Sequence, residues 1–168
     1  DATPTASALP SLSPELAAQR ATALAEPKPV KPPEASENTE EGAINAAFYF
    51  LQLYRYAFIA GDTTDFAAMS EEGCVFCKST IDDATTLHEG GGWANPWDQE
   101  APNVTYIPAG EGKEYCGVKM TIESGESTSV DSSGQVQHSD ARDDTQLFIA
   151  LRYYDGGWHV GQVSVLDS

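Results

Sequence analysis

The sequence predicts an α+β domain: a long helix and two shorter helices pack on a strongly curved, cone-like antiparallel sheet. Two observations support this class. Apolar residues at helical spacing and glycines that stop helices occur between residues 39 and 92, and alternating strand patterns fill the rest of the chain. Helices that precede a run of strands favour an α+β arrangement, with the helices on one face of the sheet.

Residues 1–38 differ in composition from everything that follows. Seven of the ten prolines fall between Pro4 and Pro33, and no aromatic residue precedes Phe48. Such a segment buries too little apolar surface to offset its ordering entropy. We therefore expect residues 1–38 to be a disordered tether, dispensable for folding, with at most a transient helix from Pro14 to Leu24. Residues 39–168 then form one domain.

The first helix of that domain is expected from Thr39 to Ala60. Thr39 can cap its start, and Gly61 stops it. Apolar side chains cover most of its circumference, which indicates burial on more than one side. Arg55 falls inside the apolar stripe, so its guanidinium needs a partner. That partner is either an internal carboxylate or the carboxylate of a ligand at the mouth of the cone.

Two shorter helices follow. Asp62 can cap the second, with Phe66 and Met69 facing inward, and the third runs from about Cys74 to His88 before the glycines at 90–92 end it. Its buried face is expected to hold Phe76 or Cys77 together with Ile81, Ala84 and Leu87.

The strands follow from alternation. Residues 115–123 place Cys116, Val118, Met120 and Ile122 on one face, and residues 147–154 form a two-sided strand. The polar stretch 124–144 is expected to be the far half of one long hairpin, with a turn at 131–134. A tight turn at Asp155-Gly156 leads into the last strand, where a bulge at Gly161 would bring its two registers into agreement.

Composition excludes several functions. With 9 basic and 26 acidic residues, the formal charge is −17, which argues against binding nucleic acid or anionic lipid through the protein surface. No apolar run is long enough to span a bilayer. The acidic residues Asp140, Asp143 and Asp144 lack the spacing of a calcium loop, so neither a metal nor a cofactor is expected.

The order of elements resembles the nuclear-transport-factor-two-like superfamily, which includes ketosteroid isomerases and SnoaL-like cyclases and has a cystatin-like cone. Within it, residues 37–98 are similar to a family of uncharacterised actinobacterial exported lipoproteins. The resemblance is carried by Glu41-Gly42-Ala43, Tyr56-Ala57, Gly61-Asp62-Thr63, Met69-Ser70 and Cys74-Val75-Phe76-Cys77. It implies a location outside the cytoplasm, tethered to the outer face of the cell membrane by a lipidated cysteine just before Asp1. It implies no activity.

The three cysteines allow more than one pairing. We expect Cys74 and Cys77 to form a disulfide in an oxidising compartment and Cys116 to stay a buried free thiol. The competing arrangement pairs Cys116 with Cys74 or Cys77. A Cys-x-x-Cys pair at a helix start is also the arrangement of thiol–disulfide proteins, although the preceding strand of that fold is missing.

The candidate ligand-binding residues are Arg55, Tyr54, Trp93 and Trp97, at the expected cone mouth. No catalytic residue is nominated, because the core face of residues 116–122 carries no acid. The predicted function is a non-enzymatic, envelope-tethered domain, a monomer or weak dimer, that binds a small ligand or an envelope protein. The alternatives are a cone-pocket enzyme of the isomerase or SnoaL type and a thiol–disulfide protein.

Overall fold

The computed structural model describes residues 12–166. Its helices are α1 (Pro14–Leu24), the short 3₁₀ helix η1 (Pro33–Ser36), α2 (Glu40–Ala60), α3 (Thr64–Met69) and α4 (Val75–Glu89). Its strands are β1 (Trp93–Ala94), β2 (Gln99–Ile107), β3 (Cys116–Ser124), β4 (Ser127–Val130), β5 (Val136–Ser139), β6 (Arg142–Tyr154) and β7 (Gly157–Leu166). Within this part of the chain, no helix has the length and apolar character needed to cross a membrane.

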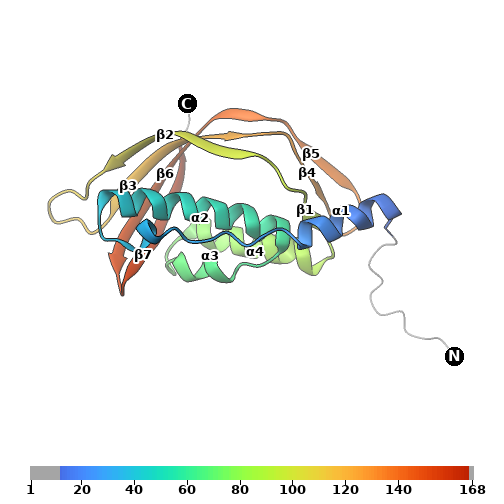
Figure 1. Cartoon of the computed structure of the whole chain (residues 1–168), viewed down its shortest axis with the longest axis horizontal. Helices are drawn as coiled ribbons and strands as arrows, with labels where there is room; N and C mark the ends of the chain where they lie inside the picture. Colours follow the sequence, from blue (N-terminus) through green and yellow to red (C-terminus); the bar gives the residue numbers. More distant parts are fainter. Residues whose placement is uncertain (1–11, 167–168) are drawn as a thin grey trace.

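The sheet arches over α2 (Figure 1). Its strand order is β2-β3-β6-β7, and every neighbouring pair is antiparallel. The helices α2, α3 and α4 lie together on one side of it. The predicted α+β class, with helices packed on a curved antiparallel sheet, is confirmed.

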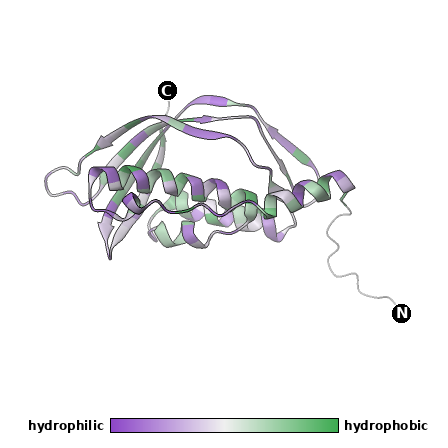
Figure 2. Cartoon of the chain, viewed as in Figure 1, coloured by the Kyte–Doolittle hydropathy of each residue, from purple (hydrophilic) through white to green (hydrophobic). Residues whose placement is uncertain are grey.

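The core lies between α2 and the sheet. Figure 2 shows hydrophobic residues concentrated along α2 and the strands that face it. Phe50 of α2 stacks on Phe66 of α3, with ring centroids 4.5 Å apart. Val118 and Met120 of β3 and Ile149 of β6 meet them from the sheet and are almost completely buried. These contacts fix α2 beneath the arch.

The helix boundaries follow the expected local signals. The Thr39 hydroxyl accepts a hydrogen bond from the Gly42 amide at 2.9 Å, and Gly61 ends α2 with a φ of 82°. Asp62 accepts from the Thr64 amide at the start of α3. In the last hairpin the register shifts at Gly161, because Ala150 pairs with Gln162 whereas Leu151 pairs with Val160. The expected bulge is therefore present.

The hairpin expected over 115–154 divides into two sheets. Strands β3 and β6 pair as far as Ser124 and Arg142, after which β4 and β5 leave and join β1 in a second sheet of order β1-β4-β5. A register shift between Ile122 and Ser124 accompanies the departure. Trp93 pairs with Val130, so β1, which follows α4, is the strand to which the polar hairpin of β4 and β5 is hydrogen-bonded.

The expectation that residues 1–38 form a disordered tether is wrong for residues 12–38; residues 1–11 lie outside the described residues. Ser13 caps α1, and the chain then runs alongside α2 to η1 (Figure 1). Ala23 and Ala35 are completely buried. Further contacts are made by polar groups: the Tyr153 hydroxyl donates to the Ser36 carbonyl and the Trp158 indole donates to that of Glu37. Small apolar residues and backbone carbonyls thus dock a segment that contains no aromatic residue.

Candidate functional site

A cavity of about 310 Å³ lies between the helices and the four-stranded sheet. Its volume is at the lower end of the range for small-molecule sites. Most of its walls are apolar, and they come from α2, α4, three strands and the segment before β2. The apolar lining residues are Leu51, Tyr54, Phe76, Trp97, Ile122, Leu147 and Val165.

The mouth of this cavity is polar. Ser127, Ser139, Asp140 and Arg142 stand around it, and the Asp140 side chain is 91% exposed. A second, more polar groove adjoins the mouth and shares four residues with it, including Arg142. The carboxylates of this groove belong to Asp98, Glu100, Glu123 and Asp143. An apolar interior therefore opens towards an acidic surface.

Tyr54 provides the aromatic wall on the helix side. Its ring packs edge-on against Phe58 and stacks near Phe76, at centroid distances of 5.2 and 5.8 Å. Burial raises the pKa of Tyr54, and the Asp83 carboxylate adds to that effect. The phenol is therefore neutral at physiological pH and can act towards a ligand as a hydrogen-bond donor or acceptor.

Arg55 is already paired inside the protein. Its Nη1 lies 2.5 Å from a carboxylate oxygen of Glu26, and its Nε donates to the Trp97 carbonyl at 2.6 Å. The two side chains of the ion pair are 25% and 18% exposed. Of the two partners expected for Arg55, the structure therefore contains the internal carboxylate. Arg55 ties the N-terminal segment to α2 and does not line the cavity.

The two tryptophans of the predicted site have different places. Trp97 lines the cavity, and the Arg55 guanidinium lies 5.5 Å from its ring centroid. Trp93 is completely buried in a second apolar cluster with Ala23, Ile59 and Val130, and its indole donates to Asn95 at 2.9 Å. Trp93 therefore does not line the cavity, contrary to its expected place at the cone mouth. The prediction assumed an extended segment, in which Trp93 and Trp97 would point to the same side. Strand β1 ends at Ala94, so this alternation does not continue to Trp97.

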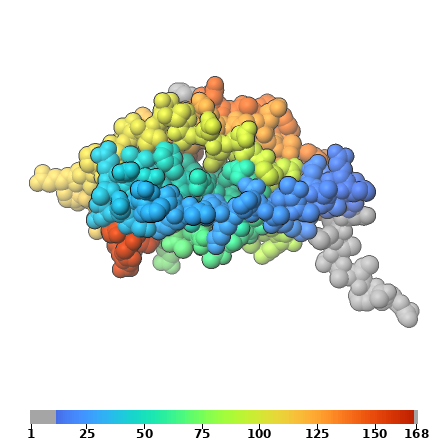
Figure 3. All heavy atoms as spheres, viewed as in Figure 1, coloured from blue at the N-terminus to red at the C-terminus, as the bar shows by residue number. Residues whose placement is uncertain are grey.

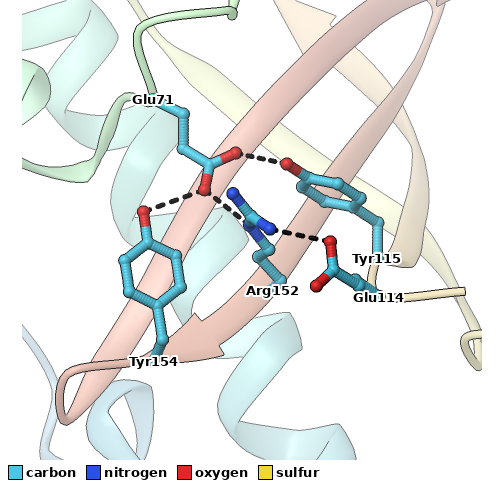
Figure 4. Close-up of polar contacts among 5 residues, drawn as sticks. All are labelled: Glu71, Glu114, Tyr115, Arg152 and Tyr154. Carbon is cyan, nitrogen blue, oxygen red and sulfur yellow. Dashed lines mark hydrogen bonds and ion pairs between the residues drawn. The ribbon is translucent and has the colours of Figure 1, made fainter.

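A cluster of polar side chains on the other side of the sheet was not predicted (Figure 4). One Glu71 oxygen accepts from the Tyr115 hydroxyl at 2.5 Å, and the other accepts from Tyr154 at 2.8 Å and from Arg152 Nε at 2.7 Å. Arg152 also donates to Glu114 and lies over both tyrosine rings. The hydrogen-bonded partners are 38 to 83 positions apart in the sequence, so no local pattern reveals the cluster.

Gly161 is the sequence signal that could have revealed the cluster. A Cβ at Gly161 would come within 2.4 Å of the Tyr115 ring and 2.9 Å of Glu71 Oε1. The absence of a side chain at Gly161 therefore makes room for this pair. The cluster joins the loop between α3 and α4 to β6 and to the segment before β3, and it lines a shallow polar groove.

Glu71 has a perturbed acidity. Burial by itself would raise the pKa of Glu71, but hydrogen bonds from Tyr115, Arg152 and Tyr154 outweigh burial and lower it. The same contacts raise the pKa of both tyrosines. The carboxylate is therefore held ionised with its lone pairs satisfied, which is typical of an anchor between two parts of a fold.

We expect Glu71→Gln to lower the free energy of unfolding at pH 7 by about 1–3 kcal/mol, since hydrogen bonds to a charged acceptor are lost. A lowered folded-state pKa gives stability that is present above the unfolded pKa of Glu and lost as pH falls through the folded value. The difference between the two proteins should therefore shrink as pH falls from 6 to 3. Urea unfolding measures it, and the exposed neighbour Glu72→Gln is the control. If Glu71→Gln and Glu72→Gln lower the free energy of unfolding equally at pH 7, Glu71 does not anchor the two parts of the fold.

The cysteines lie as follows. Cys74 and Cys77 are joined, with an S–S distance of 2.08 Å, and both are about 1% exposed. Cys116 is a free thiol on the core face of β3, and burial raises its pKa. Thiol–disulfide exchange requires access of an attacking thiolate to a sulfur atom. The burial of both sulfurs therefore favours a structural bridge over redox catalysis.

One group of potential metal ligands is present among residues 12–166. Glu126, His138 and Asp140 offer ligand atoms within 4.8 Å of one another, and all three are exposed. The His138 ring lies 3.4 Å from the Glu126 carboxylate. Exposed carboxylates beside a histidine are common on acidic proteins, and nothing buried orients these three.

The comparisons with known proteins concern family and fold. The model of a family of unknown function (DUF6318) matches residues 15–164. No curated protein matches the sequence. The family match begins inside α1, so it includes the N-terminal segment that the structure docks on the domain.

Several solved structures are similar. The intermembrane-space region of the chloroplast protein ARC6 has a TM-score of 0.60 at 16% identity, over 79% of this chain and 99% of that one. Aln2 from a Streptomyces species gives 0.45 at 13% identity, over 74% and 89%. An uncharacterised protein with a cystatin-like fold from Caulobacter vibrioides gives 0.46 at 10% identity, over 75% and 91%. The likeness to the ARC6 region shows a shared fold alone.

Proposed function

The chain belongs to a family of unknown function, DUF6318, and we propose from its own geometry that the domain binds a small apolar ligand between α2, α4 and the sheet. The observation that carries the proposal is the 310 Å³ cavity with seven apolar lining residues and a polar mouth. Apolar walls with a few polar groups at one end are the usual composition of a small-molecule site.

Binding is a better description of this cavity than catalysis. Catalytic acids and bases are typically held in partly buried positions with perturbed pKa values. The charged groups that line this cavity, Asp140 and Arg142, have side chains 91% and 68% exposed at its mouth. The alternative of a ketosteroid-isomerase or SnoaL-type enzyme would need such a group deeper inside. An apolar side chain of an envelope protein is the remaining alternative occupant.

The test uses N-phenylnaphthylamine, an uncharged dye whose fluorescence rises in apolar surroundings. We expect saturable binding of one dye per chain. Val165→Trp should weaken it at least about tenfold, equivalent to 1.4 kcal/mol, because a larger side chain fills the cavity. The control is Ile107→Trp, another exposed apolar residue on an edge strand, outside the cavity. No saturable binding by the unmodified protein, or equal binding by both variants, would contradict the proposal.

We further propose that the protein acts outside the cytoplasm, held at the outer face of the cell membrane by a lipid anchor. The joined pair Cys74–Cys77 supports this location, since disulfides persist mainly in oxidising compartments. When the protein is denatured directly from the producing cells, so that burial does not protect the sulfurs, an alkylating reagent should label these two cysteines only after reduction. Direct labelling of both without a reductant would contradict an oxidising location.

A further inference from the structure

A second cavity of about 290 Å³ lies on the opposite side of Leu51, between α2 and β2. Figure 3 shows a hollow here, between the cyan helix and the yellow strand. Phe48 and Tyr49 of α2 and Ala101 of β2 contribute to its walls, and Pro32 of the N-terminal segment stands at its edge. This outer cavity and the inner cavity described above share Leu51, Gln99 and Ile122.

The shared residues form the partition between the two cavities. Leu51 and Ile122 are core side chains, 6% and 7% exposed, held by their helix and strand. Gln99 is different, because its side chain is polar and crosses from the first residue of β2 to α2. Its Nε2 donates to the Leu51 carbonyl at 3.2 Å. That carbonyl lies within α2 and already accepts a hydrogen bond from a backbone amide of the helix. The bond from Gln99 is therefore a second one to the same oxygen.

We infer that the inner and outer cavities are two halves of one passage, closed by the Gln99 side chain, and that the ligand is an elongated, unbranched apolar chain whose length Gln99 limits. This inference rests on the proposed function of the inner cavity. The inner chamber is mainly apolar, and the outer one is lined by six apolar and four polar residues. Two adjoining chambers suit an elongated chain better than a compact ring system. The long hydrogen bond of Gln99 makes it the part of the partition that moves at least cost.

The charge at the inner mouth selects the head group for the test. Asp98, Glu100, Glu123 and Asp143 line the adjoining groove, so an anionic head would be repelled there. The probes are therefore alkyltrimethylammonium ions of increasing chain length, used below their micelle-forming concentrations. Each methylene transferred from water to an apolar site should raise the affinity about fourfold.

Calorimetry with this series distinguishes the possibilities. For the unmodified protein, affinity should rise with chain length and then stop rising once the chain reaches Gln99. For Gln99→Ala the rise should continue, so that the longest chain binds at least about tenfold more tightly than to the unmodified protein. Gln99→Asn, which shortens the side chain by one methylene, should lie between them and serves if the alanine variant does not fold.

The matched control is Gln52→Ala, which widens the outer cavity but leaves the partition unchanged. It should keep the chain-length limit of the unmodified protein. If affinity stops rising at the same chain length in Gln99→Ala, Gln99→Asn and the unmodified protein, the two cavities are not joined through Gln99. The inner cavity would then be a separate site. Absence of binding by every chain would instead overturn the proposed function itself.

Discussion

A chain that begins at Thr39 should be less stable than one that begins at Leu12 by at least about 3 kcal/mol. Its thermal midpoint should fall by about 10 °C or more. The physical reason is the loss of every contact that α1, η1 and the connection between them make with the domain. Arg55 loses the Glu26 carboxylate, and the Trp158 indole loses its acceptor at Glu37.

The effect is expected to be large because the lost groups are buried or partly buried. Removal of one member of a buried ion pair costs more than the pair contributes, since the remaining charge is left without a partner. Glu26→Gln in the full chain measures the contribution of the Glu26–Arg55 ion pair alone. It should lower the free energy of unfolding by less than the truncation does. Thermal unfolding of both truncated chains is the measurement. Thermal midpoints within about 2 °C of each other correspond to a stability difference of less than about 1 kcal/mol. That result would support the original expectation that the N-terminal segment is dispensable for folding.

Trp93→Ala is the second change with a large expected effect, about 3–5 kcal/mol of unfolding free energy. Trp93 is completely buried among residues of α1, α2 and β4, so its removal leaves a cavity and loosens the attachment of α1. Denaturant unfolding measures the loss. The matched variant is Trp97→Ala, which should cost less stability because Trp97 is only partly buried.

The two tryptophans should separate stability from binding. At a temperature where both variants are folded, Trp97→Ala should bind N-phenylnaphthylamine more weakly than Trp93→Ala does. The reason is that only Trp97 contributes to the cavity wall. The reverse order, with Trp93→Ala losing the dye and Trp97→Ala retaining it, would show that the site has been misplaced.

Local signals in the sequence predicted much of the fold. Thr39 and Gly61 bound α2 because a cap and a left-handed glycine act on neighbouring backbone groups. The alternation of residues 116–122 predicted the buried face of β3, and two conflicting registers in the last strand predicted the bulge at Gly161. Each of these features depends on residues close together in the chain.

Long-range contacts were not predicted. The pairing of Glu26 with Arg55 spans 29 positions, and Ala23 and Ala35 are buried although their surroundings look like a linker. The second sheet forms because β1 pairs with β4 of the polar hairpin. No periodicity in residues 124–144 predicts this pairing. Of the four predicted binding residues, Tyr54 and Trp97 line the cavity, whereas Arg55 and Trp93 hold the N-terminal segment in place.

The most direct test of the ligand site follows the indole N–H resonances of the three tryptophans by NMR during titration with N-phenylnaphthylamine. Trp97 lines the cavity, Trp93 is buried in the second cluster, and the Trp158 indole is bound to the Glu37 carbonyl at 2.7 Å. Trp→Phe variants assign the three signals. A ligand in the cavity predicts the largest shift at Trp97 and little change at Trp158. A largest shift at Trp158, or no shift at any of the three while the dye binds, would contradict the cavity as the binding site.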